Sequence, residues 1–94
     1  MKAELIYKNK VHFASGAIVE EVLWRLPQAD DERPHRLKYS LVYIRDGRRM
    51  VGYDNERGKG EHRHYGNFEE PYDFVSIDQL IADFKADVEA EESK

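Results

Sequence analysis

The dipeptide Asp46-Gly47 separates two segments in which polar and apolar residues alternate, RLKYSLVYIR and RRMVGYD. Asp-Gly is typical of two-residue β-hairpin turns, because both turn positions need positive φ angles. The sequence therefore predicts an antiparallel hairpin over residues 36–54. A two-residue turn also sets the pairing of the two strands, which places Tyr39 opposite Asp54.

Further alternating segments predict more strands on both sides of the hairpin. We expect strands over residues 2–8 and 11–13, joined by a turn at Asn9-Lys10. A short strand is expected over residues 62–65. The segments between the strands contain Gly, Pro and charged residues, which are typical of turns and surface loops.

Residues 17–26 allow two interpretations. The run IVEEVLWRL contains Glu, Leu and Arg, which helices tolerate well. Its β-branched and aromatic residues, and Pro27 at its end, favour a strand instead. In a strand the apolar residues at even positions share one face, and these are Ile18, Val22, Trp24 and Leu26.

The sequence Ser76-Ile77-Asp78-Gln79 is a capping box and predicts the start of a helix, with the Gln79 side chain reaching back to the N-cap Ser76. Apolar residues then recur at helical spacing on one face, which comprises Ile77, Leu80, Ile81, Phe84 and Val88. The acidic residues 89–94 are expected to fray. Together these elements predict an α+β fold in a single domain over residues 1–94. It is a mostly antiparallel β-meander of four to six strands with a C-terminal α-helix packed on one face.

The composition limits which cell compartment and which binding partners we expect for this chain. The chain has no cysteine, which excludes a disulfide framework and a thiolate zinc site. No apolar run is long enough to span a bilayer, and the N-terminal residues lack the apolar segment of a signal peptide. We therefore expect a soluble cytoplasmic protein without membrane contact.

Residues 33–64 carry nine Lys or Arg against four Asp or Glu, a local charge of +5 that could attract a polyanion.

Residues 52–66, GYDNERGKGEHRHYG, concentrate polar chemistry on a glycine-rich loop and the short strand after it. Strand alternation puts His62 and His64 on one face and Arg63 on the other. Imidazoles with ordinary pKa values near ~6.5 suit acid–base catalysis at neutral pH. Together with nearby cations, this constellation resembles what metal-independent cleavage of RNA without a cofactor would require. The two histidines would act as acid and base, in an order that the residues leave open, and Asp54 would orient one of them.

The phosphate groups of the RNA would be held by cations, which comprise Arg45, Arg48, Arg49, Arg57, Lys59 and Arg63. Three of these arginines crowd the tip of the predicted hairpin and need an anion or a carboxylate nearby. Asn55 and Tyr53 are expected to support the site. Tyrosines at strand spacing could stack on bases, although they more often belong to a core.

Other functions stay open from the residues alone. Histidines on an exposed polar strand could bond only to their neighbours and have no catalytic role. A non-enzymatic module could bind nucleic acid through residues 33–64 or bind a protein partner. A metal-dependent hydrolase is a further alternative, because two histidines two apart on a strand can share a metal ion. Its third ligand would come from Asp54, His12 or His35.

The block GYDNERGKGEHRHYG, with HRLKYSLVYIRDGRR before it and EEPYDFVSIDQLIADF after it, resembles the TumE-type family of small bacterial proteins. The likeness covers roughly residues 3–88. Its most specific part, YDN…H-x-H, corresponds to Asp54, Asn55, His62 and His64. The resemblance implies the toxin half of a toxin–antitoxin pair, with a helix-turn-helix antitoxin as partner. It also implies interference with bacterial growth through an activity directed at RNA.

Overall fold

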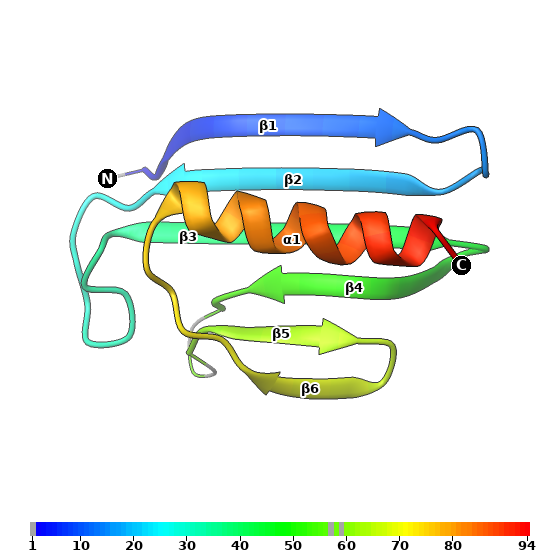
Figure 1. The fold of residues 1–94 in the computed structure, drawn as a ribbon. Helices are drawn as coiled ribbons and strands as arrows, with labels where there is room; N and C mark the ends of the chain where they lie inside the picture. The colour runs from blue at the N-terminus through cyan, green and yellow to red at the C-terminus, as the bar shows by residue number, and fades with distance from the viewer. Residues whose placement is uncertain (1, 57, 59) are drawn as a thin grey trace.

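An antiparallel sheet carries a C-terminal helix on one face (Figure 1). The computed structural model describes residues 2–56, 58 and 60–94. In these residues the strands are β1 (Glu4–His12), β2 (Ile18–Arg25), β3 (Leu37–Arg45), β4 (Arg48–Asp54), β5 (His62–Tyr65) and β6 (Phe68–Pro71), and the helix is α1 (Ile77–Glu92). The strands follow one another in the sheet in the order β1-β2-β3-β4-β5-β6, each antiparallel to the next. The predicted α+β meander is confirmed.

The first strand differs from the prediction. Residues 4–12 form one strand along β2, so the turn expected at Asn9-Lys10 is wrong. Cross-strand contacts hold both residues in the ladder, because the Asn9 amide donates to Glu21 Oε1 over 3.1 Å and Lys10 Nζ lies 3.4 Å from Glu20 Oε1. Pairing with a long neighbouring strand thus outweighs the turn preference of Asn.

Residues 18–25 form strand β2 as predicted, and the face of its odd-numbered residues is the one that packs against the core. Val19, Glu21 and Leu23 are buried, whereas the apolar residues at even positions are only half-buried on the other face. Glu21 occupies a core-facing position on this strand. Its carboxylate accepts hydrogen bonds there from the Tyr7 hydroxyl at 3.3 Å and the Asn9 amide at 3.1 Å. Two donors make the burial of this charge tolerable.

The hairpin of β3 and β4 has the predicted turn. Asp46 and Gly47 have φ angles of 54° and 72°, the positive values that this turn needs. Arg45 pairs with Arg48 directly behind the turn, as the two-residue loop predicted.

Beyond the first two pairs, a bulge shifts the register of β3 and β4 by one residue. Tyr43 pairs with Val51 and Ser40 pairs with Asp54, so the predicted pairing of Tyr39 with Asp54 is wrong. A one-residue shift moves every following side chain to the other face of the sheet. The bulge therefore keeps the apolar residues of β4 in the core and places Asp54 on the face away from α1.

The core lies between the sheet and α1. Tyr39, Tyr43 and Tyr53 are 2%, 0% and 0% exposed, so they are core residues and cannot stack on bases. The predicted apolar face of α1 packs against them, with Leu80, Phe84 and Val88 buried and Ile77 and Ile81 partly buried. This interface explains why the helix forms where the periodicity of the sequence predicts it.

Acidic residues of α1 accept hydrogen bonds from tyrosine hydroxyls at the edge of this core. The pairs are Tyr43 with Glu92, Tyr53 with Asp87, Tyr65 with Asp87 at 2.9 Å, and Tyr72 with Asp83 at 2.6 Å. Burial raises the pKa of Tyr53 and Tyr72, so both hydroxyls keep their protons and donate them. The acidic C-terminal segment therefore forms the polar boundary of the core.

The ends of α1 agree with the prediction in part. Ser76 Oγ accepts from the Gln79 N–H at 3.1 Å, as an N-cap does, but the Gln79 side chain donates to Asp83 at 2.7 Å instead of reaching back. The helix continues to Glu92, whose carboxylate accepts from Ser15 Oγ at 3.0 Å. Fraying of residues 89–94 stays a prediction. In the part of the chain that is described, no helix has the length and apolar character to cross a membrane.

Candidate active site

Strands β4 and β5 bring Asp54, His62 and His64 together on the face of the sheet away from α1. Asp54 pairs with His62 and Gly52 pairs with His64, and paired residues point to the same face. The two histidines share this face because they are two residues apart, as alternation predicts. They are 4% and 7% exposed. We call Asp54, His62 and His64 the acid–histidine cluster.

One carboxylate contacts both imidazole rings. Asp54 Oδ1 lies 2.7 Å from His62 Nε2, and Asp54 Oδ2 lies 3.5 Å from His64 Nε2. The ring centroids of the histidines are 4.8 Å apart in an edge-to-face arrangement. His62 Nδ1 lies 3.0 Å from the Gly60 carbonyl. Because a carbonyl only accepts, Nδ1 carries a hydrogen, and Nε2 can donate to Asp54 only when the ring is protonated.

Glu69 is a fourth member of this neighbourhood that the sequence analysis missed. It pairs with His64 across β5 and β6, and its carboxylate oxygens lie 3.5 Å from His62 Nε2 and 3.8 Å from His64 Nδ1. Beside His62 is an open groove of about 290 Å³, lined by Glu61, His62, Glu69, Glu70 and Pro71. Recognition of Gly66-Asn67 as a hairpin turn would have placed Glu69 opposite His64.

Burial and a neighbouring arginine make His64 a weaker base than an exposed histidine. The pKa of His64 is lowered by burial first and by Arg49 second, while Asp54 and Glu69 act in the opposite direction. Arg49 reaches this position by crossing Gly52, where an added Cβ would lie only 3.0 Å from Arg49 Cδ. Gly52 thus leaves the space that brings the guanidinium close to His64.

Replacing Arg49 with glutamine is expected to raise the pKa of His64, because the guanidinium no longer disfavours the protonated ring. Burial of the ring is unchanged in this variant, so the change in pKa reports the guanidinium charge alone. Titration of the histidine ring protons by NMR measures this. Arg48→Gln is the matched control, because Arg48 pairs with Arg45 on the other face of the hairpin. An equal rise in both variants would show that proximity to His64 is not the cause.

The predicted phosphate-binding residues are spread over two faces. Arg49 lies next to His64, and Arg48 is exposed at the hairpin tip. Arg45 turns toward the end of α1, where Nη1 donates to the Glu91 carbonyl at 3.1 Å and Nη2 lies 3.7 Å from its carboxylate. Glu91 is thus the carboxylate that the crowded hairpin tip was expected to need. Arg57 and Lys59 lie outside the described residues.

Arg63 lies on the face of the sheet that α1 covers, away from the acid–histidine cluster. Its Nε donates to Glu70 Oε1 at 3.2 Å and its Nη1 to the Tyr53 hydroxyl at 3.4 Å. The guanidinium carbon lies 5.3 Å from the ring centroid of Tyr65. These contacts give Arg63 a structural role, and the structure does not bring it to the predicted phosphate site.

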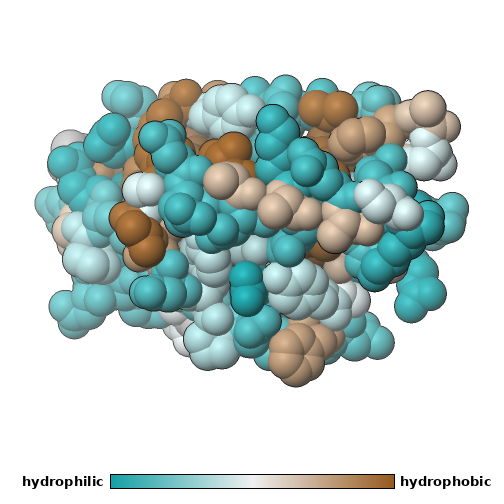
Figure 2. Space-filling view, viewed as in Figure 1, coloured by the Kyte–Doolittle hydropathy of each residue, from teal (hydrophilic) through white to brown (hydrophobic). Residues whose placement is uncertain are grey.

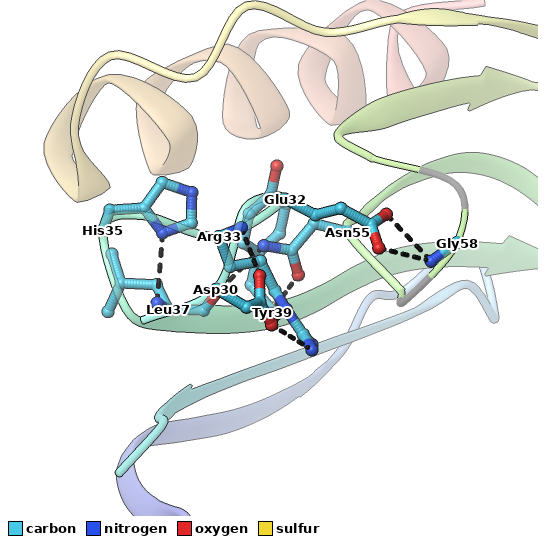
Figure 3. A network of polar contacts seen from close by, with 8 residues as sticks. All are labelled: Asp30, Glu32, Arg33, His35, Leu37, Tyr39, Asn55 and Gly58. Carbon is cyan, nitrogen blue, oxygen red and sulfur yellow. Dashed lines mark hydrogen bonds and ion pairs between the residues drawn. The ribbon is translucent and has the colours of Figure 1, made fainter. Parts of the chain in front are cut away.

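Asn55 and Tyr53 were expected to support the site, and neither contacts it directly. Tyr53 is in the core below α1. Asn55 is 1% exposed, and its side chain bonds to the backbone of β3 (Figure 3): Oδ1 accepts from the Tyr39 N–H at 3.0 Å, and Nδ2 donates to the Leu37 carbonyl at 2.8 Å. Asn55 therefore continues the β3–β4 ladder one step past Asp54 and holds the start of the glycine-rich loop.

The remaining histidines do not join the cluster. His35 accepts from the Leu37 N–H through Nδ1 at 3.1 Å and bonds to Glu61 through Nε2. His12 is exposed at the end of β1, an edge strand of the sheet. Among the described residues, the group that could hold a metal ion is Asp54, His62 and His64.

Comparison with known proteins gives one family. A family model described as Toxin TumE matches residues 2–92 of the chain. No curated protein and no solved structure matches it. The family model covers almost the whole chain, including the acid–histidine cluster, α1 and the sheet. The chain belongs to the TumE family of toxins.

Proposed function

We propose that this toxin is one half of a toxin–antitoxin pair and cleaves RNA by metal-independent acid–base chemistry at the acid–histidine cluster. The observation that carries the proposal is the contact of two imidazole rings with one carboxylate on the sheet face away from α1. RNA as substrate places the activity in the cytoplasm. The partner would be a helix-turn-helix antitoxin, as the family resemblance implies.

The two histidines have different surroundings, which suits them to different roles. The lowered pKa of His64 leaves its ring neutral at pH 7, so it can take the proton of a ribose 2′-hydroxyl. The 2′ oxygen then attacks the adjacent phosphorus, and the bond from phosphorus to the 5′ oxygen breaks. In its protonated form His62, whose Nε2 lies 2.7 Å from Asp54 Oδ1, gives a proton to that leaving oxygen. The products are a 2′,3′-cyclic phosphate and a 5′-hydroxyl.

Cationic side chains would bind the phosphate groups of the RNA. Arg49 stands beside His64, and Arg48 is exposed next to it in the chain. Arg57 and Lys59 belong to the loop that leads into His62, and we include them from the sequence. Charge at these positions would stabilise the negative charge that develops on the phosphate oxygens.

Induction of the protein in a bacterial host is expected to stop growth and degrade RNA, whereas the double variant His62→Asn/His64→Asn should do neither. Asparagine at position 62 can keep an N–H near the Gly60 carbonyl, so the fold should survive, and circular dichroism checks this. His12→Asn is the matched control and should arrest growth like the wild type. Purified wild type should cleave RNA in EDTA. Normal growth with intact RNA during wild-type expression would overturn the proposal.

A protein-binding module without catalysis is the second candidate. Edge strand β1 exposes a row of apolar side chains, comprising Leu5, Ile6, Tyr7 and Val11. Figure 2 shows brown patches along the edge of the molecule where β1 lies. An exposed apolar edge strand favours pairing with another chain. Binding of the antitoxin that is insensitive to salt, together with a harmless and inactive free chain, would favour this function.

A further inference from the structure

We propose that Asp54, His62 and His64 form a binding site for a divalent transition-metal ion such as Zn²⁺. The three side chains supply two imidazole nitrogens and a carboxylate oxygen on one sheet face. Two histidines and one carboxylate, with a fourth position left open, are a recurring ligand set for Zn²⁺. The site needs no cysteine, in keeping with a chain that has none.

The spacing of the ligand atoms fits a small ion. All three lie within 4.8 Å of one another. Ligand atoms bound about 2.0–2.1 Å from a tetrahedral Zn²⁺ are about 3.3–3.5 Å apart. The separations of Asp54 oxygens from His62 Nε2 and His64 Nε2, 2.7 and 3.5 Å, bracket this value. All three side chains already share one face of the sheet.

The ring of His62 is held as metal-binding histidines usually are. Its Nδ1 donates to the Gly60 carbonyl at 3.0 Å, which turns the Nε2 lone pair of the neutral ring toward Asp54. A backbone carbonyl on the second ring nitrogen is one of the common ways to orient a histidine ligand. Gly60 has a φ of 70°, a value that favours glycine, so the position of this carbonyl depends on the residue type.

One carboxylate oxygen of Asp54 lies in the cluster without a hydrogen-bond partner in the part of the chain that the structure describes. Asp54 Oδ1 is buried and has no hydrogen-bond partner among the described residues, although it lies 2.7 Å from His62 Nε2. With the His62 ring neutral, two lone pairs face each other across this distance. Such an arrangement needs a cation, either a proton on Nε2 or a metal ion bound by both atoms.

Charges of both signs surround the cluster, with Arg49 beside His64 and the Glu69 carboxylate beside both rings. Glu69 lines the open groove of about 290 Å³ beside His62, and its carboxylate lies 3.5 Å from His62 Nε2, so a metal ion that enters by this groove meets one acidic side chain at the cluster. The Glu69 carboxylate lies 3.8 Å from His64 Nδ1, beyond hydrogen-bond distance, so it adds negative charge beside that ring without bonding to it.

A bound ion would affect activity, and this consequence rests on the proposed function. The ion takes Nε2 of His62 and of His64, which are the atoms that the acid–base mechanism uses. Zn²⁺ is therefore expected to inhibit RNA cleavage, and chelation should restore it. The metal would then compete with the substrate reaction at the same side chains.

Metal binding can be measured without RNA. Isothermal titration of the EDTA-treated protein with ZnCl₂ should show one ion per chain, and competition with a chromophoric chelator should give the affinity. We expect His62→Asn, His64→Asn and Asp54→Asn each to weaken binding by more than about 100-fold, since even outer-shell changes cost about 10–100-fold. His12→Asn, on β1, should bind like the wild type.

The outcomes separate the metal site from the proposed function. Wild-type affinity equal to that of the three variants would overturn the metal site. Tight binding by a chain that neither arrests growth nor cleaves RNA would keep the site and overturn only the proposed function. Tight binding that accelerates RNA cleavage would keep the site and overturn the metal-free mechanism. Circular dichroism of each variant shows that lost affinity does not come from unfolding.

Discussion

Replacing His64 alone with asparagine is expected to lower the rate of RNA cleavage at pH 7 by about 100-fold or more, because general acid–base catalysis typically contributes about 10²–10⁴ in rate. The variant should stay folded. The carboxylate oxygens facing the His64 ring nitrogens are 3.5 and 3.8 Å away, longer than good hydrogen bonds, so little binding energy within the fold is lost. Single-turnover cleavage of a short RNA in EDTA gives the rate.

His62→Asn should show a comparable loss on RNA but a different dependence on the leaving group. A phosphodiester whose leaving oxygen needs no proton bypasses the general acid. The proposed acid, His62, should therefore matter much less on such a substrate, while the proposed base, His64, should matter as much as before. If the cleavage rate on this substrate recovers in His64→Asn instead of His62→Asn, then His64 is the acid and His62 is the base.

His12→Asn controls for loss of an imidazole elsewhere in the sheet, and it should cleave like the wild type. Unchanged single-turnover rates in both cluster variants would remove the histidines from the mechanism. A loss of rate that tracks a loss of helix and sheet content by circular dichroism would show instead that the rings act through stability.

The hairpin of β3 and β4 shows which parts of the fold can be predicted from the local sequence and which cannot. Asp46-Gly47 predicted the turn and the first pairs behind it, and both are confirmed. The bulge that follows was not predictable from the turn. It results from burial of Val51 and Tyr53, each 0% exposed, under a helix that comes much later in the chain. Tertiary packing selected the register, and the face of Asp54 followed from it.

The candidate site was predictable to a similar depth. Alternation alone put the two histidines of β5 on one face, and the structure confirms it. The partners of the other predicted site residues depend on elements that are distant in the sequence. Arg63 meets Glu70 and Tyr53 because β6 and the core are on its side of the sheet, so its predicted phosphate role does not follow from its charge. Long-range pairing decides which neighbours a charged side chain finds.

The contacts of the acidic C-terminal segment were likewise not predictable from the sequence. Its charge density in the sequence is typical of a solvated surface. In the structure Asp83, Asp87 and Glu92 accept hydrogen bonds from buried tyrosines of distant segments. Helical periodicity predicted which apolar residues enter the core. It could not predict which carboxylates would meet tyrosine hydroxyls, because those tyrosines come from β3, β4, β5 and the segment after β6.

Asn55→Ala is expected to be the most destabilising change near the site. The asparagine side chain satisfies two buried backbone groups of β3, the Tyr39 N–H at 3.0 Å and the Leu37 carbonyl at 2.8 Å. Each buried polar group left without a partner costs about 1–3 kcal/mol. The free energy of unfolding should therefore fall by about 2–6 kcal/mol, a large part of the ~5–15 kcal/mol typical of a domain.

Thermal and urea unfolding of Asn55→Ala, beside the matched control Asn67→Ala, measures this loss. Asn67 lies exposed in the turn between β5 and β6, so its replacement should change the stability by no more than about 0.5 kcal/mol. A small domain loses about 4–8 °C in Tm for each kcal/mol, so Asn55→Ala should melt at least about 8 °C below the wild type. Asn55→Asp should not rescue it, because a carboxylate cannot donate to the Leu37 carbonyl. Equal Tm values for the two alanine variants would mean that the ladder closes without Asn55. The asparagine of the YDN block would then have its role at the site instead of in the sheet.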